Sequence, residues 1–138
     1  MAEVRVVQRL SHPAELVWAL VGDFGSLHRW HPQVRGLDLS WEGRIRTLHY
    51  ADGGHAVECL EIRNDPARRY VYTLVDGTFP VQDYRATLQV AADDEPGCLV
   101  VWSSEFEPLG ADDAIAIDLL RQHYGEGLAS LAAALPPR

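Results

Sequence analysis

The spacing of apolar residues near the end of the chain predicts a long amphipathic helix over 112–135. Six apolar residues recur there at steps of three or four, which places them on one side of a helix: Ile117, Leu120, Tyr124, Leu128, Leu131 and Leu135. Asp112 and Asp113 suit its N-terminus, and Pro136 ends it. Because such a helix gains most of its stability by packing, a wide partner surface is expected.

Gly125 and Gly127 lie within this helical pattern. Glycine in a helix interior costs about 1 kcal/mol relative to alanine, so its presence needs a reason. Either the helix bends at these positions or another group comes close to its backbone. We interpret the pair as a site of close approach.

The first part of the chain changes from a strand pattern to a helix pattern. Alternating apolar and polar residues predict a strand over about 4–10, and the Ser-His-Pro sequence at 11–13 predicts a helix start with proline just inside the helix. Apolar residues then follow at helical spacing up to Gly22: Leu16, Val17, Leu20 and Val21. A further helical turn is expected before Pro32, around Phe24, Leu27 and Trp30.

From Val34 to Pro108 the chain alternates between β-rich runs and turn residues. Turns are predicted at 42–43, 52–54, 64–66, 77–80 and 93–97. The runs between them are rich in Val, Tyr, Thr, Leu and Ile, and they cover 44–51, 55–63, 69–76, 83–91 and 98–107. Short connections between consecutive strands predict an antiparallel meander.

Together these elements predict an α+β fold in one domain, residues 1–138. A seven-stranded antiparallel sheet twists, and a sheet of that size can curl around one long helix in its concave face. Two short helices follow the first strand. The gap between the curved sheet and the long helix is a natural place for an internal cavity.

Charge and cysteine content narrow the possible partners. A net charge of -8 argues against binding to nucleic acid or to an anionic membrane surface. Charged residues interrupt the apolar stretch over 1–22, so we predict no signal sequence and no membrane insertion, and we expect a cytoplasmic protein. Cys59 and Cys98 are expected to be free thiols. His49 and His55 flank a predicted hairpin without further ligands at metal spacing, so we expect neither a metal nor a cofactor.

Three segments carry a resemblance to a known family. They are GDFGSLHRWHP at 22–32, GTFPVQDYRATLQV at 77–90 and VVWSSEFEPLG at 100–110. With the order of the predicted elements, they resemble the START-like or helix-grip (SRPBCC) superfamily, and within it the bacterial polyketide cyclase/dehydrase-like branch. The resemblance covers about 3–135 of the chain.

The resemblance implies a deep apolar cavity between the long helix and the loops. The segment around Trp30 and the turn near Pro80 would form part of its entrance. Members of the superfamily include cyclases, aromatases, lipid carriers and hormone receptors, so the fold alone does not specify one activity. The family's cyclases commonly rely on cavity shape and a few polar groups, so the resemblance transfers no catalytic set.

Glu58 is the first candidate for a catalytic group. It shares one face of the run 55–63 with the apolar residues Ala56, Leu60 and Ile62. If that face lines the cavity, burial would raise the pKa of Glu58 and suit it to general acid or base chemistry near neutral pH. Alternatively, Glu58 is a structural carboxylate paired with an arginine such as Arg46, or it is solvated.

Aromatic and aliphatic side chains are the candidates for ligand contacts. Alternation places them on the inner faces of three strands and on the apolar stripe of the long helix: Tyr72, Tyr84, Trp102, Leu120, Tyr124 and Leu128, with Trp30 before Pro32. The tyrosine hydroxyls would orient a ligand oxygen or hold Glu58. Packing of an ordinary core produces the same pattern.

His31 is the second catalytic candidate, and His28 a weaker one. A histidine at a cavity mouth can transfer protons near neutral pH, and the neighbouring Trp30 can stack on a flat ligand. Such a cluster more often caps the end of a helix. No Ser/His/Asp triad is indicated, because Ser103 and Ser104 lie in a predicted strand without a nucleophile elbow.

Three hypotheses about function follow from the sequence. The first is binding of a small, apolar, aromatic or polyketide-like molecule with cyclisation or dehydration, in which Glu58 removes a proton next to a carbonyl and a tyrosine hydroxyl stabilises the enolate. The second is a non-catalytic carrier or sensor, which needs an apolar pocket and few polar groups. The third is an interaction module whose cavity is filled by its own aromatic side chains.

Overall fold

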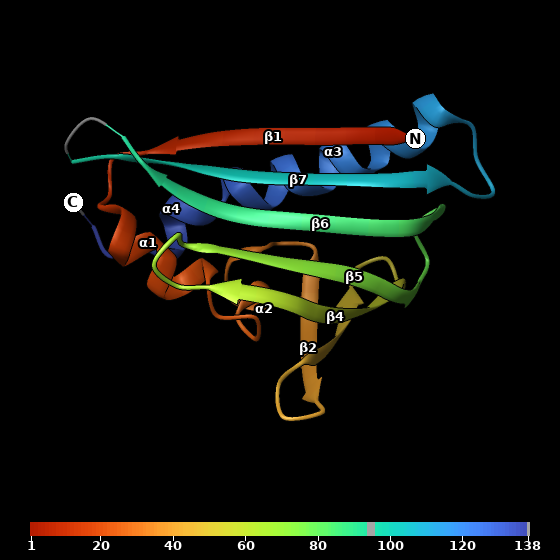
Figure 1. Cartoon of the computed structure of the whole chain (residues 1–138), viewed down its shortest axis with the longest axis horizontal. Coiled ribbons are helices and arrows are strands. Elements are labelled where there is room, and N and C mark those ends of the chain that lie inside the picture. The colour runs from red at the N-terminus through yellow and green to blue at the C-terminus, as the bar shows by residue number, and fades with distance from the viewer. Residues whose placement is uncertain (94–95, 138) are drawn as a thin grey trace.

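The computed structural model describes residues 1–93 and 96–137. Within these residues there are seven strands and four helices, and their order is the one expected from the sequence except that the last helix is divided in two (Figure 1). The strands are β1 (Ala2–Leu10), β2 (Val34–Ser40), β3 (Ile45–Tyr50), β4 (His55–Asn64), β5 (Arg69–Gly77), β6 (Val81–Ala92) and β7 (Cys98–Pro108). The helices are α1 (Ala14–Val21), α2 (Leu27–Trp30), α3 (Asp113–Ala129) and α4 (Leu131–Ala134). Residues 94 and 95 of the turn predicted at 93–97 lie outside the described residues.

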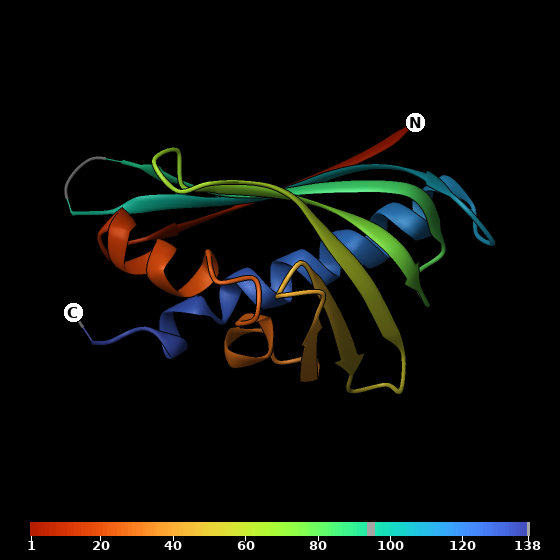
Figure 2. The same ribbon diagram turned by 60° about the horizontal axis from the view of Figure 1, so that its bottom comes forward.

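The seven strands form one antiparallel sheet in the order β1-β7-β6-β5-β4-β3-β2. Strand β1 forms one edge of the sheet and pairs with β7, while β2 to β7 pair consecutively as a meander. Figure 2 shows the sheet curving over α3, with α1 and α2 on the same side. The α+β helix-grip architecture predicted from the sequence is therefore confirmed. Among the described residues, no helix is long and apolar enough to cross a membrane.

Helix α3 begins where the sequence indicated. The side chain of Asp112 caps it by accepting a hydrogen bond from the backbone N–H of Ile115 at 3.0 Å. The apolar stripe is buried except for Ile117, which is half-buried. The continuous helix predicted over 112–135 is divided in the structure, because Ser130 separates α3 from α4. Ser130 follows Gly125 and Gly127 in the sequence, so the helix is not divided at either glycine.

Only one of the two helix glycines marks a close approach. A Cβ atom at Gly127 would lie 2.5 Å from Cδ2 of His31, whereas a Cβ at Gly125 would have no neighbour within 4 Å. The expectation of close approach is thus right for Gly127 and wrong for Gly125. The backbone of α3 meets the loop after α2 at Gly127, and this contact fixes the helix end against the rest of the core.

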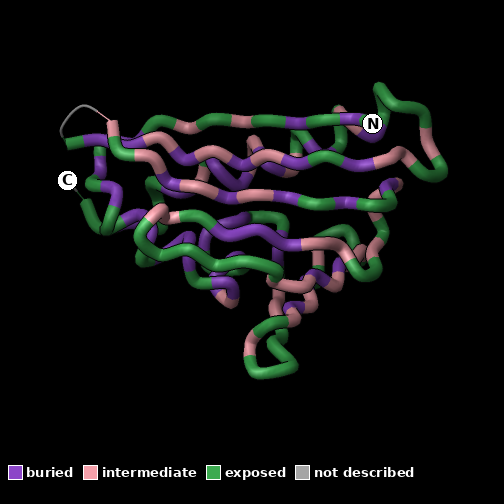
Figure 3. The backbone as a smooth tube through the Cα atoms, viewed as in Figure 1, coloured by how far each residue is buried: buried purple, intermediate pink, exposed green. Residues whose placement is uncertain are grey.

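Two details of the strands and of α1 differ from the sequence-based expectations. Ile62 is 48% exposed instead of sharing the inner face with Glu58, because the register of β4 against β5 shifts between Leu60 and Ile62. Pro13 lies at the N-cap of α1, one position before the helix begins. The tube in Figure 3 shows buried and exposed positions alternating along the strands, as expected when one face of a sheet covers the core.

Candidate functional site

A buried ion pair between Arg46 and Glu58 lies on the concave face of the sheet. The two residues are directly opposite one another in the β3–β4 ladder. The Nε atom of Arg46 donates to Oε1 of Glu58 at 2.8 Å, and the side chains are 0% and 7% exposed. Arg46, which the sequence suggested as a possible structural partner of Glu58, is therefore the residue that pairs with it.

The guanidinium of Arg46 is enclosed by aromatic residues and a carbonyl group. Its Nη1 atom donates to the carbonyl oxygen of Phe24 at 3.1 Å and to the hydroxyl of Tyr70 at 3.4 Å. Its central carbon lies 4.0 Å from the ring centroid of Phe24 and 4.8 Å from that of Tyr72. These contacts hold the cation behind Glu58, away from the interior void described below.

Burial and Arg46 act on the pKa of Glu58 in opposite directions. Burial raises the pKa of Glu58, while the charge and the hydrogen bond of Arg46 act against that rise. Arginine stays protonated in proteins. Protonating Glu58 would leave the buried Arg46 cation without its anionic partner, which is costly. The pair therefore holds a buried carboxylate whose proton affinity is higher than that of an exposed glutamate.

The predicted aromatic residues form one packed cluster between the sheet and α3. The indole N–H of Trp102 donates to the hydroxyl of Tyr72 at 3.0 Å, and the hydroxyls of Tyr72 and Tyr84 lie 3.4 Å apart. The hydroxyl of Tyr84 also contacts that of Tyr124. The rings of Trp102 and Tyr124 are stacked with centroids 4.3 Å apart. These rings fill the centre of the space that the sequence suggested would be a cavity.

His31 is buried and both of its ring nitrogens are occupied. The backbone N–H of Gln33 donates to Nδ1 at 3.1 Å, so the proton of the neutral ring is on Nε2, which donates to the carbonyl oxygen of His123 at 2.7 Å. Burial lowers the pKa of His31, although the His123 carbonyl and Glu126 oppose this. The geometry is that of a neutral histidine that connects the α2 loop to α3.

A small void lies next to Glu58 in the interior. It has a volume of about 10 Å³, close to the least space that one water molecule needs. Its lining includes Glu58, Tyr84 and Leu120 from the predicted set. The other lining residues are Tyr50, Ala56, Leu74, Phe79, Val81 and His123. The deep cavity that the resemblance implies is thus almost closed in this structure.

A larger pocket lies outside this void, between α3 and the turns that follow β3 and β5. Its volume is about 630 Å³. Its lining residues are Gln33, Tyr50, Asp52, Gly53, Gly54, Thr78, Phe79, Pro80, Leu119, Gln122, His123 and Glu126. We call it the mouth pocket. Leu119 is 41% exposed there, which leaves an apolar surface of α3 available to a ligand.

Three rings separate the mouth pocket from the inner void. Tyr50, Phe79 and His123 line both spaces. Their ring centroids are 5.1 to 5.6 Å apart, so each ring contacts the other two. His123 also stacks on His31 at 4.3 Å. Movement of these three rings would join the mouth pocket to the void at Glu58.

The mouth pocket contains residues that the sequence did not single out. Of the candidate residues, Trp30, His31, Tyr72, Trp102, Tyr124 and Leu128 are buried and line neither space. Pro80 lines the mouth, as the resemblance implies, whereas Trp30 packs on Trp102 with ring centroids 5.7 Å apart. Tyr50 and Phe79 lie at or next to turns, and His123 flanks the apolar stripe. For Tyr50 and Phe79, aromatic character next to turn residues was the available signal in the sequence.

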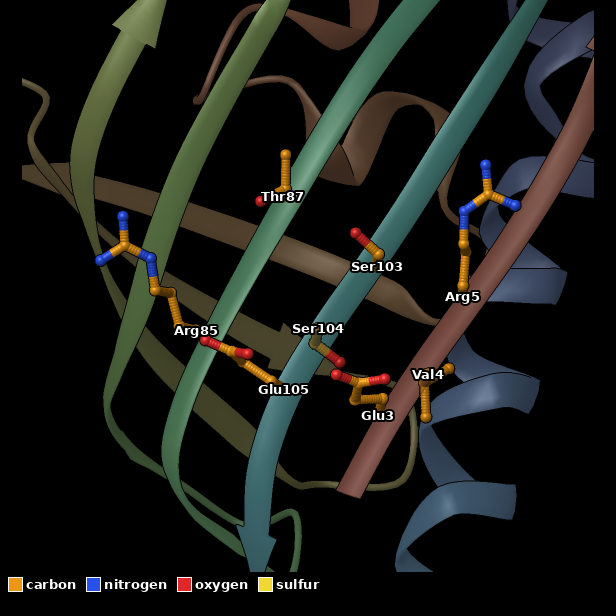
Figure 4. A pocket seen from close by; sticks show the side chains of 8 residues that line it. All are labelled: Glu3, Val4, Arg5, Arg85, Thr87, Ser103, Ser104 and Glu105. Atoms are coloured by element: carbon orange, nitrogen blue, oxygen red, sulfur yellow. The ribbon is translucent and has the colours of Figure 1, made fainter. Parts of the chain in front are cut away.

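A second depression, of about 380 Å³, lies on the convex face of the sheet (Figure 4). Thr87 and Ser103 are short, while Arg5 and Arg85 extend on either side of them. The remaining lining residues are Glu3, Val4, Ser104 and Glu105, so no aromatic residue contributes. This polar depression is a weaker candidate for a hydrophobic ligand than the mouth pocket.

The two histidines of the β3–β4 hairpin do come together, as their spacing indicated. His49 and His55 are opposite one another in the ladder, but each bonds a different carboxylate. Nε2 of His49 lies 2.8 Å from Asp38, and Nε2 of His55 lies 3.2 Å from Asp76. These exposed pairs lie outside the mouth pocket lining.

Comparison with known proteins gives a consistent picture of the fold. A family model described as polyketide cyclase/dehydrase and lipid transport matches residues 1–136. The protein XoxI from Bacillus cereus has a structure that superposes with a TM-score of 0.94 at 37% identity, covering 98% of this chain and 96% of that one. No curated protein matches the chain at a significant level.

More distant structures share the fold. A START superfamily protein from Mycobacterium smegmatis matches with a TM-score of 0.70 at 17% identity, covering 97% of this chain and 94% of that one. The Zhui aromatase/cyclase from a Streptomyces species matches with a TM-score of 0.77 at 15% identity, covering 96% and 92% of the two chains. At these identities the likeness concerns the architecture alone.

Proposed function

The chain belongs to the polyketide cyclase/dehydrase and lipid transport family, and we propose that it binds a small hydrophobic molecule, aromatic or polyketide-like, in the mouth pocket. The observation that carries this proposal is the 630 Å³ pocket between α3 and the turns, with aromatic rings at its inner end and Leu119 on its wall. Its size falls within the range of small-molecule sites. The structure offers less support for a ligand fully enclosed in the interior, because the rings around Trp102 occupy that space.

Native mass spectrometry of protein purified without detergent tests this proposal. We expect a stoichiometric adduct whose released molecule is apolar. A variant with the pocket filled, Gln122→Trp, should lose the adduct, because Gln122 is an exposed residue of α3 that lines the pocket. Arg121→Trp is the matched control, since Arg121 is exposed on the same helix and lines neither space. Equal adducts in both variants would contradict a site in the mouth pocket.

A second candidate function is cyclisation or dehydration at Glu58. Glu58 and Tyr84 both line the inner void, so a carboxylic acid residue and a tyrosine border the same small space. With the three separating rings displaced, a substrate carbonyl could be placed between the two groups. Glu58 would then remove a proton next to the carbonyl, and the hydroxyl of Tyr84 would donate a hydrogen bond to the enolate oxygen.

Glu58→Gln distinguishes this enzyme from a carrier. A carrier should release its ligand chemically unchanged, with or without the substitution. An enzyme of this mechanism should convert the molecule identified by mass spectrometry and should lose at least about 100-fold in turnover when the base is removed. Unchanged turnover in a folded Glu58→Gln protein would exclude Glu58 as the base. His31 is a poorer choice of base, because both its nitrogens already have hydrogen-bond partners.

A further inference from the structure

The path from solvent to Glu58 is lined by carboxylates. Asp52 and Glu126 line the mouth pocket, and Glu58 lines the void behind the three rings. Among the described residues that line either space, none is lysine or arginine. The mouth pocket therefore carries negative charge from Asp52 and Glu126, while Glu58 behind the rings is paired with Arg46. The whole chain also has a net charge of -8.

The neighbouring basic groups do not place a cation in the lining of the mouth pocket. Arg46 is fully buried behind Glu58 and is absent from the lining of both spaces. His123 does line them, but burial together with the nearby His31 and Arg46 lowers its pKa well below the ordinary value, so its ring is neutral at pH 7. A ligand in the mouth pocket thus meets carboxylates without an exposed cation beside them.

Both outer carboxylates keep an oxygen that is not used in a local hydrogen bond. Oδ1 of Asp52 accepts from the backbone N–H of Gly54 at 2.8 Å, and Oε1 of Glu126 accepts from the side chain of Gln122 at 2.9 Å. Glu58 likewise uses Oε1 for Arg46. The second oxygens of Asp52 and Glu126 have no hydrogen-bond donor among the described residues and remain available to a ligand in the mouth pocket.

The aromatic rings between these carboxylates favour the same kind of ligand. The faces of Tyr50 and Phe79 carry partial negative charge, which attracts a cation placed over the ring. Both rings line the mouth pocket and lie between Asp52 at the rim and Glu58 inside. An ammonium group would interact favourably with a carboxylate and a ring face together, whereas a ligand carboxylate or phosphate would be repelled by both.

We propose that the hydrophobic ligand of the mouth pocket carries a protonated amino group, which pairs with Asp52 and Glu126 and lies against the rings of Tyr50 and Phe79. This inference rests on the proposed function and specifies the chemical class of its ligand. Fatty acids and phosphorylated acyl groups are disfavoured as ligands, because their anionic ends would lie among the pocket's carboxylates without a compensating lysine or arginine.

Three probe molecules that share one ring and differ in charge provide the test: phenethylamine, phenethyl alcohol and hydrocinnamate. Their dissociation constants are measured at low ionic strength by amide chemical-shift titration of the full chain. We expect phenethylamine to bind at least about tenfold more tightly than hydrocinnamate. The side chains of Asp52 and Glu126 should attract the ammonium group of the first probe and repel the carboxylate of the second. The alcohol should lie between them, and added salt should reduce the difference.

Charge-removing variants show whether the preference arises in the pocket. The double variant Asp52→Asn, Glu126→Gln should reduce the ratio between amine and carboxylate to less than about threefold. Two carboxylates on the convex face provide the control, because Glu3→Gln, Glu105→Gln removes the same net charge away from the mouth pocket and should leave the ratio unchanged.

Failure of this inference differs from failure of the proposed function. If the alcohol binds in the mouth pocket and the carboxylate binds as tightly as the amine, the pocket stands and the ammonium ligand is wrong. Equal loss of the preference in the two double variants would assign it to overall charge and would also overturn the inference. If none of the three probes shifts the signals of residues around Tyr50, both proposals fail.

Discussion

Arg46 and Glu58 face one another across two neighbouring strands, and each is the other's buried countercharge, with 2.8 Å between Nε and Oε1. Their position in the ladder fixes this geometry, since opposite residues on one face of an antiparallel pair have neighbouring side chains. The desolvation of both ions is offset by the ion pair and by the contacts of Arg46 with Phe24 and Tyr70. The pair provides a buried carboxylate next to the void without leaving an isolated charge in the core.

Removing one member of this pair should be more harmful than removing both. Arg46→Met leaves Glu58 buried without its cation and is expected to lower the free energy of unfolding by about 3–5 kcal/mol. In the double variant Arg46→Met, Glu58→Leu no charge is buried, so the loss should be smaller than in Arg46→Met alone. Denaturant unfolding of the single and double variants measures the coupling, and additive losses would contradict it.

Acidification should destabilise the fold through His31 and His123, whose pKa values are lowered in the folded state. The pKa of His31 and that of His123 are lowered by burial, whereas an unfolded histidine has a pKa near 6.5. As pH falls through about 6.5, the unfolded chain therefore takes up protons first, and stability is lost by up to about 1.4 kcal/mol per pH unit for each histidine. The loss continues until pH reaches the lower pKa of the folded state.

The histidine effect can be separated from that of Glu58 by comparing variants. The raised pKa of Glu58 acts in the opposite direction, because its contribution is present at low pH and is lost as pH rises through the folded pKa. His123→Gln should therefore have a flatter decline of unfolding free energy below about pH 6.5 than the unchanged chain. His28→Gln, at an exposed position of α2, should not alter the decline. Parallel curves for all three proteins would contradict the assignment.

The sequence was sufficient to predict the architecture because each element carries its own periodic signal. Alternation along β6 and β7 places Tyr84 and Trp102 on the inner face, and the stripe of α3 places Tyr124 opposite them. A strand period cannot distinguish a residue that lines a cavity from one that fills a core, since both point inward. The near closure of the interior therefore could not be predicted from the pattern that predicted the fold.

The mouth pocket was difficult to predict for a different reason. Its inner end is formed by Tyr50 at the end of β3, Phe79 in a turn and His123 on the flank of α3, which are far apart in the sequence. Only the curvature of the sheet and the position of the helix bring them together. Ile62 shows the same limitation on a smaller scale, because the register shift in β4 that exposes it has no clear signal in the sequence.

The hydroxyl of Tyr72 is expected to stabilise the core through Trp102. It accepts the hydrogen bond of the buried indole N–H at 3.0 Å. Tyr72→Phe leaves that donor without an acceptor and should cost about 1–3 kcal/mol in unfolding free energy, with a shift of the indole N–H resonance. Tyr50→Phe is the control, since among the described residues no hydrogen-bond partner of its hydroxyl is found. Similar stabilities for the two variants would contradict a role for this bond.

The two glycines of α3 should respond in opposite ways to substitution by alanine. At Gly125 a Cβ meets no atom within 4 Å, so Gly125→Ala should raise the unfolding free energy by about 0.5–1 kcal/mol through helix propensity. At Gly127 the new Cβ would lie 2.5 Å from Cδ2 of His31. The imidazole of His31 cannot turn aside without losing hydrogen bonds to Gln33 and to the His123 carbonyl.

Gly127→Ala should therefore destabilise the protein by about 1–3 kcal/mol in spite of the better helix former, because the overlap must be relieved by shifting His31 or the helix. Thermal and denaturant unfolding of the two variants under the same conditions provide the measurement, and each is the control for the other. A shift of the His31 ring would also move His123, which it stacks on, and so disturb the inner end of the mouth pocket. Stabilisation by both substitutions would show that α3 does not meet the α2 loop as closely as the 2.5 Å contact requires.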